Sequence, residues 1–74
     1  MQTDYKVDSI YVDEETGEVF AKCYDNVYGE KFEKYLGNPN DYQSSMTASM
    51  MLEDSNFSMK DELRNEIIST FGLE

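Results

Sequence analysis

The order of apolar and polar positions divides the chain into a strand-like front half and a helix-like back half. Residues 5–36 hold four Val and most of the Tyr, whereas residues 41–71 hold four of the five Met. β-Branched and aromatic residues favour strands, and Met favours helices. The pattern therefore predicts an α+β fold.

Three strands are predicted in the front half, and they are separated by polar turns at residues 13–18 and 25–29. The predicted strands are Tyr5–Val12, Val19–Tyr24 and Glu30–Leu36. A short helix is an alternative for the third segment, since Phe32 and Leu36 lie four residues apart. We prefer the strand, because a lone hairpin is marginal and three strands begin to be stable.

The first strand alternates imperfectly. Tyr5, Val7 and Tyr11 share one parity, while Ile10 and Val12 take the other. A β-bulge places two residues of one strand opposite one residue of its partner. A bulge near Ser9 would therefore bring more of these apolar residues to one face.

The segment after Gly37 predicts a first helix. Asn38 is a candidate N-cap, with Pro39 at the first helical position. An apolar stripe then follows at i, i+4 and i+8, with one more Met close to it: Tyr42, Met46, Met50 and Met51.

A second helix is predicted close to the end of the sequence. Ser58 is its candidate N-cap, and Gly72 supplies its stop. Its apolar stripe consists of Met59, Leu63 and Ile67, widened by Ile68 and Phe71. The predicted architecture is a single domain over residues 1–74, with a three-stranded antiparallel β-meander followed by two helices packed on one face.

Charge is the strongest compositional signal. Sixteen Asp and Glu face six Lys and Arg with no His, which gives a formal net charge of −10. Direct binding to nucleic acid is disfavoured, because that affinity comes largely from cations that neutralise phosphates. Anionic membrane surfaces are disfavoured for the same reason. A basic protein surface is the natural electrostatic partner.

The sequence contains little that indicates catalysis. It has no His, and its only cysteine, Cys23, falls inside a predicted strand, where a buried structural thiol is expected. No Cys/His cluster or phosphate-binding glycine loop is present. We therefore expect a protein that is not an enzyme and that uses no cofactor or metal. The lone cysteine and the polar N-terminal residues predict a cytoplasmic location.

The candidate partner-binding residues are acids of the predicted turns, third strand and last helix, together with one tyrosine. Carboxylates on a twisted sheet or helix can imitate a row of phosphates, since alternate strand residues lie about 6.6 Å apart. Tyr is favoured at interface hot spots, and Tyr24 and Tyr35 are further contact candidates. The predicted set is Asp13, Glu14, Glu15, Glu18, Asp25, Tyr28, Glu30, Glu33, Asp61, Glu62 and Glu66.

Small size, strong acidity, many Tyr and no catalytic equipment are similar to the profile of phage-encoded inhibitors, including DNA mimics and some anti-CRISPR proteins. This resemblance is one of composition over the whole chain, and no motif carries it. It implies a module that blocks the basic nucleic-acid-binding surface of a partner. The alternative is a small assembly protein or accessory subunit, which forms a homodimer through the apolar face of Met46, Met50 and Met51.

Overall fold

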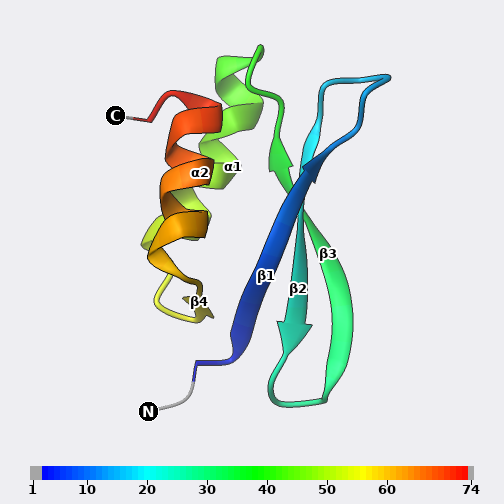
Figure 1. Ribbon diagram of the computed structural model, residues 1–74, viewed down its shortest axis with the longest axis vertical. Coiled ribbons are helices and arrows are strands. Elements are labelled where there is room, and N and C mark those ends of the chain that lie inside the picture. The colour runs from blue at the N-terminus through cyan, green and yellow to red at the C-terminus, as the bar shows by residue number, and fades with distance from the viewer. Residues whose placement is uncertain (1–2, 74) are drawn as a thin grey trace.

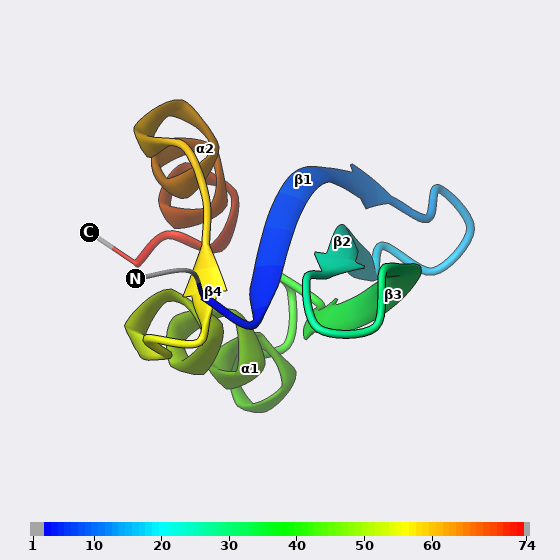
Figure 2. The ribbon, with the colours of Figure 1, turned by 90° about the horizontal axis from the view of Figure 1, so that it is seen from below.

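The computed structural model describes residues 3–73 and has an α+β fold, with four strands in a curled sheet and two helices. The elements are β1 (Tyr5–Val12), β2 (Val19–Asp25), β3 (Glu30–Gly37), α1 (Tyr42–Glu53), β4 (Phe57–Ser58) and α2 (Asp61–Phe71). Both helices lie on the same side of the sheet, which can be followed from the side (Figure 1) and from below (Figure 2). The other side of the three long strands is left open to solvent.

The sheet is mixed, in the order β3-β2-β1-β4. β1–β2 and β2–β3 are antiparallel and form the predicted meander, whereas β4 runs parallel to β1. The three-stranded prediction was therefore incomplete. Two residues are too few to be recognised as a strand by periodicity, but the backbone N–H of Tyr5 donates to the carbonyl of Asn56 at 2.9 Å and fixes this pairing.

The irregularity predicted near Ser9 is present. Val7 lies opposite Cys23 and Ser9 lies opposite Lys22, so that Asp8 is the extra residue of a β-bulge. The bulge changes the parity of β1 and turns both Val7 and Ile10 toward the helices, where Val7 is buried and Ile10 packs on the core.

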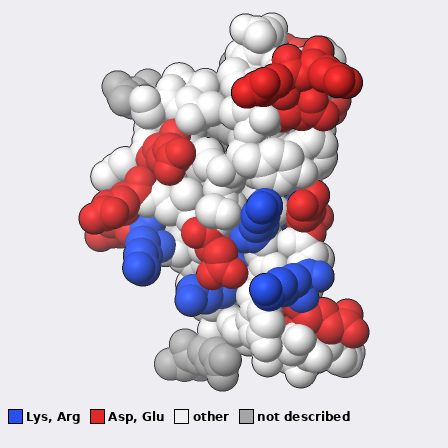
Figure 3. All heavy atoms as spheres, turned by 45° about the vertical axis from the view of Figure 1, so that its right-hand side comes forward, with Lys and Arg blue, Asp and Glu red and all other residues white. Residues whose placement is uncertain are grey.

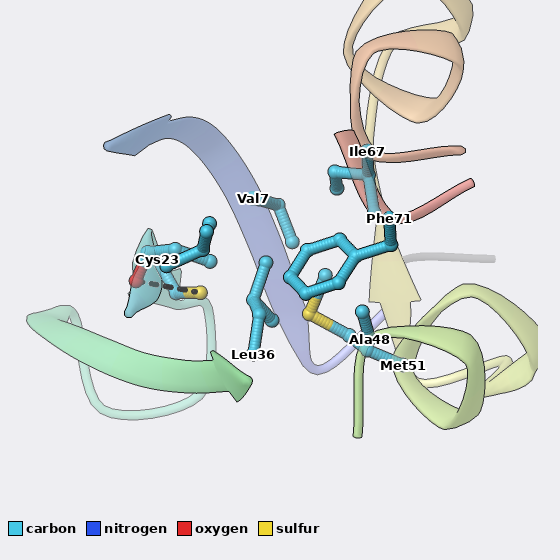
Figure 4. Packing of buried hydrophobic residues seen from close by; sticks show 9 residues of the cluster. Val7, Cys23, Leu36, Ala48, Met51, Ile67 and Phe71 are labelled. Carbon is cyan, nitrogen blue, oxygen red and sulfur yellow. Dashed lines mark hydrogen bonds between the residues drawn. The ribbon is translucent and has the colours of Figure 1, made fainter. Parts of the chain in front are cut away.

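The core lies between the sheet and the two helices. Figure 4 shows Leu36, Met51 and Phe71 meeting between β3, α1 and α2, with Val7 beside them. The buried apolar residues are Val7, Val19, Ala21, Cys23, Leu36, Ala48, Met51, Ile67 and Phe71.

Helix α1 begins at Tyr42, later than predicted. Asp41 is its N-cap and accepts from the backbone N–H of Gln43 at 3.1 Å. Asn38, the predicted cap, instead donates from its side chain to the carbonyl of Thr16 and accepts from the N–H of Asn40. It therefore belongs to the loop before the helix, together with Pro39.

The buried face of α1 also differs from its predicted stripe. Ser45, Ala48 and Met51 are buried, whereas Tyr42, Met46 and Met50 are exposed. The cause is close approach: a Cβ built on Gly37 would lie 2.1 Å from the carbonyl oxygen of Ser44. Small side chains suit such contact between the helix and the end of β3.

Helix α2 begins at Asp61, after Lys60, and no side chain caps it. Ser58, the predicted N-cap, lies in β4 and donates to the carbonyl of Tyr5 at 3.3 Å. The predicted stop is confirmed, because Gly72 is left-handed with φ 64°. Arg64 reaches back to the carbonyl of Leu52 at 3.0 Å and joins α2 to the last turn of α1.

Candidate functional site

The densest group of acids lies on the β1–β2 loop, which we name the acidic tip: Asp13, Glu14, Glu15 and Glu18. The loop is held by its own backbone, since Asp13 N–H donates to the carbonyl of Glu18 at 2.8 Å and Gly17 N–H donates to that of Asp13 at 2.7 Å. A fixed backbone presents these carboxylates from one small turn.

Side chains reinforce this turn. The Asp13 carboxylate accepts from the N–H of Glu15 at 2.9 Å, and the Thr16 hydroxyl accepts from the N–H of Glu18 at 3.2 Å. Asn38, from the loop before α1, donates to the carbonyl of Thr16 at 3.1 Å. Glu14 and Glu15 are exposed and take no part in these bonds through their carboxylates.

Asp25, Tyr28 and Glu30 lie at the β2–β3 turn, at the end of the sheet away from the acidic tip (Figure 1). The Asp25 carboxylate accepts from the N–H groups of Val27 and Tyr28, at 2.8 and 3.1 Å, so it closes the turn. Tyr28 is 79% exposed. Asp25 therefore has a structural role, while Tyr28 is available to a partner.

Glu33 lies on the open face of the sheet, in the middle of β3. It accepts from the Tyr11 hydroxyl at 2.8 Å, and this bond, followed by desolvation and the charge of Glu33, raises the pKa of the Tyr11 phenol. Lys22 is 5.5 Å from the centre of the Tyr11 ring. Glu33 is thus part of a local polar network.

The open face also carries an aromatic cluster that was not predicted. Phe20 stacks on Tyr11 with ring centres 5.5 Å apart and meets Tyr35 edge-on at 5.6 Å. In β2 the buried residues Val19, Ala21 and Cys23 alternate with Phe20, which therefore points away from the core. Only the strand register, with Phe20 opposite both Tyr11 and Tyr35, brings the three rings together.

The acids of α2 form a fourth location. Asp61 and Glu62 occupy its first turn, where negative charge complements the helix dipole, and Glu66 follows one turn later. All three are exposed. The predicted set is therefore divided among the acidic tip, the β2–β3 turn, the open face and α2.

Few of these acids are neutralised by a neighbour. Within residues 3–73, the single ion pair closer than 4.0 Å joins Lys6 and Asp8, at 3.6 Å. Figure 3 shows Asp and Glu gathered at the end of the molecule where the β1–β2 loop lies, whereas Lys and Arg are mixed with acids farther down. On this view, the acids at that end are gathered without a Lys or Arg among them.

Helix α1 presents an uncharged, partly apolar surface. Tyr42, Met46 and Met50 are 83%, 52% and 67% exposed. No Asp, Glu, Lys or Arg occurs between Tyr42 and Leu52. Burying this face against another protein would bring no charge out of water.

Cys23 is buried on the helix side of β2. Its thiol is 3.7 Å from the carbonyl of Ala21, and burial raises its pKa to about 11. A thiol with this pKa stays protonated at neutral pH, so it is a poor nucleophile.

Metal-binding geometry is absent from the described part of the chain, where no three Cys, Asp or Glu side chains converge. None of the helices within residues 3–73 is long and apolar enough to cross a membrane. Comparison with protein families, curated proteins and solved structures finds no match.

Proposed function

We propose that this protein is an acidic protein-binding module, whose acidic tip occupies the basic nucleic-acid-binding surface of a cytoplasmic partner. The observation that carries the proposal is the density of unpaired charge on a rigid turn. Four carboxylates lie within residues 13–18, and this loop holds no Lys or Arg.

The rigidity of the tip favours binding. Its backbone is fixed by the bonds between Asp13 and both Gly17 and Glu18, and it is anchored to the rest of the domain through Asn38. A loop that is already ordered loses little conformational entropy when it binds. The carboxylates therefore need little rearrangement to meet a basic surface.

The mechanism is steric and electrostatic competition with nucleic acid. A field of one sign steers oppositely charged partners and raises their association rate. Salt shortens the range of this attraction, since the Debye length falls from about 10 Å at 0.1 M to about 3 Å at 1 M. A phage-type inhibitor of this kind acts by occupying the nucleic-acid-binding surface of its partner, and it needs no catalysis, cofactor or metal.

A second candidate function is assembly through α1, which would make the protein an accessory subunit or a homodimer. The exposure of Tyr42, Met46 and Met50 on an uncharged helix face supports it. Met side chains adapt to many partners. Association through this face should persist as the salt concentration rises, whereas binding through the acidic tip should weaken.

The test is affinity capture from a bacterial lysate with two variants of equal net charge. The tip-neutral variant carries Asp13→Asn, Glu14→Gln, Glu15→Gln and Glu18→Gln, and Asn at position 13 retains an oxygen that can accept from Glu15. The matched control neutralises four exposed acids outside the predicted binding set, namely Asp4→Asn, Asp8→Asn, Glu53→Gln and Asp54→Asn.

We expect the wild type and the control to retain the same basic protein at 0.1 M salt. The tip-neutral variant should bind it about tenfold or more weakly, since the local field is lost while the overall charge is matched. Equal loss in both variants would indicate a nonspecific charge effect. Equal retention in both, at all salt concentrations, would favour the α1 face.

A further inference from the structure

Strand β3 is one edge of the sheet, because within residues 3–73 it pairs with β2 alone in the order β3-β2-β1-β4. Helix α1 approaches the C-terminal end of β3, where Gly37 lies close to the backbone of Ser44 and Ser45. Glu30, Lys31 and Glu33 are exposed, and Phe32 and Lys34 are half-buried. An uncovered edge strand offers unpaired backbone groups to another strand.

The charges along this edge alternate in sign around a central aromatic residue, as Glu30, Lys31, Phe32, Glu33 and Lys34. In a symmetric dimer the two edges are antiparallel, and the two-fold axis runs through the sheet at right angles to it. Opposed residues then point to the same face, so that the axis must pass through a pair of identical residues.

Only one position of this axis pairs every charge with its opposite. With the axis at Phe32, Glu30 faces Lys34 of the second copy and Lys31 faces Glu33 of the second copy. An axis at Glu30, Lys31, Glu33 or Lys34 places two like charges directly opposite each other, which is destabilising. An axis at Tyr35 leaves Glu33 and Lys34 without charged partners.

We propose that two copies of this chain pair through β3, antiparallel and with Phe32 on the two-fold axis. Backbone hydrogen bonds between the edges give the affinity, and the alternating charges select the register. The proposal goes beyond the proposed function, since it needs neither the acidic tip nor a basic partner.

The aromatic contacts of Phe32 on the helix side of the sheet support this axis. Phe32 meets Tyr5 edge-on at 5.5 Å, and Tyr5 packs on Phe57 at 4.9 Å. Residues directly opposite in an antiparallel pair have Cβ atoms about 4.5–5.5 Å apart. The second Phe32 therefore extends this aromatic row across the interface.

A short paired segment predicts a weak dimer, because interfaces below about 1,200 Å² are typical of transient association. The axis also turns one copy upside down relative to the other. The two acidic tips then lie at opposite ends of a continuous sheet, where each is free to meet its own partner.

The test is a charge swap between Glu30 and Lys34, read by sedimentation velocity from micromolar to millimolar protein. Glu30→Lys is the informative single variant, because Glu30 lies opposite Asp25 within its own chain. Removing that like-charge pair should leave the monomer at least as stable. In the dimer the same substitution sets a lysine side chain opposite Lys34 of the other copy, once at each end of the paired segment.

We expect Glu30→Lys to raise the dimer Kd about tenfold, Lys34→Glu to do the same, and the double variant to restore wild-type dimerisation. Isotope-filtered nuclear Overhauser effects should join Glu30 of one copy to Lys34 of the other. Circular dichroism checks that Lys34→Glu, which loses its contact with the Phe57 ring, still folds.

Two results would overturn the proposal. One is a wild-type protein that stays monomeric up to millimolar concentration. The other is a dimer that Glu30→Lys leaves unchanged, or that the double variant fails to restore. A dimer lost instead on Met46→Ser with Met50→Ser would assign the contact to α1. None of these results bears on capture of a basic partner by the acidic tip.

Discussion

Individual side chains in this protein have different roles even where they share a chemistry. Asp13 and Asp25 both accept backbone N–H groups and fix turns, whereas Glu14 and Glu15 expose their carboxylates. Asp8 is the residue that makes the bulge of β1. The number of acids therefore overstates how many are available for binding.

At this scale, the buried thiol of Cys23 makes stability depend on pH in the alkaline range. Its folded pKa of about 11 lies above the ordinary value near 9, so the folded state keeps the proton that the unfolded chain loses. Its contribution is fully present below pH 9 and is lost as pH rises toward 11.

We expect the free energy of unfolding of the wild type to fall by about 1–2 kcal/mol more than that of Cys23→Ala between pH 8.5 and 10.5. Urea unfolding at each pH measures this difference and cancels the titration of Lys and Tyr common to both proteins. Parallel pH profiles for the two proteins would contradict the burial of this thiol.

The elements show which local signals determine structure and which depend on contacts across the fold. The three long strands were predicted to within one residue, because the β-branched and aromatic runs end at polar turns, whereas the two-residue β4 was missed. The bulge followed from a parity change in β1. In contrast, Asn38 and Ser58 have the right chemistry for N-caps, yet tertiary hydrogen bonds engage both elsewhere.

In helix α1, tertiary contacts, and not the apolar stripe of the sequence, determine which face is buried. Its strongest apolar stripe, through Tyr42, Met46 and Met50, is exposed, and a face with Ser45 and Ala48 is buried. Sequence periodicity measures how apolar residues are spaced, but it does not reveal that Gly37 brings β3 close to the helix backbone. Of the four apolar residues predicted to face the core, Met51 alone is buried.

Two neighbouring methionines allow a matched test of this helix orientation. Met51 is 2% exposed and Met50 is 67% exposed. We expect Met51→Ala to lower the free energy of unfolding by about 2–5 kcal/mol through loss of buried surface and a cavity. Met50→Ala should change it by about 0.5 kcal/mol or less.

Denaturant unfolding at neutral pH measures both changes. A larger loss for Met50→Ala than for Met51→Ala would mean that α1 packs on the sheet through the predicted stripe. The assembly candidate on the α1 face would then lose its exposed surface.

Over the whole molecule, position matters more than total charge. The sequence was sufficient to predict an acidic protein with a hairpin tip rich in carboxylates, because those residues are adjacent in the chain. It was insufficient to predict which acids lie together in space, since Glu33 and Asp61 belong to different sides of the fold. The sequence likewise does not show that β3 lies at an edge of the sheet, because this depends on the strand order.

The proposed function depends on the acidic tip. This loop has a hydrogen-bonded backbone, four carboxylates within one turn and no cation of its own. These properties suit competition for a surface that normally binds phosphates. They predict that the protein and a nucleic acid cannot bind the partner at the same time.

The most direct measurement is displacement of a fluorescent oligonucleotide from the captured basic partner, followed by anisotropy at 0.1 M salt. We expect the wild type and the control with Asp4, Asp8, Glu53 and Asp54 neutralised to release the oligonucleotide at similar concentrations, while the tip-neutral variant needs a concentration about tenfold higher. A ternary complex, with anisotropy that rises when the wild type is added, would contradict competition through the acidic tip.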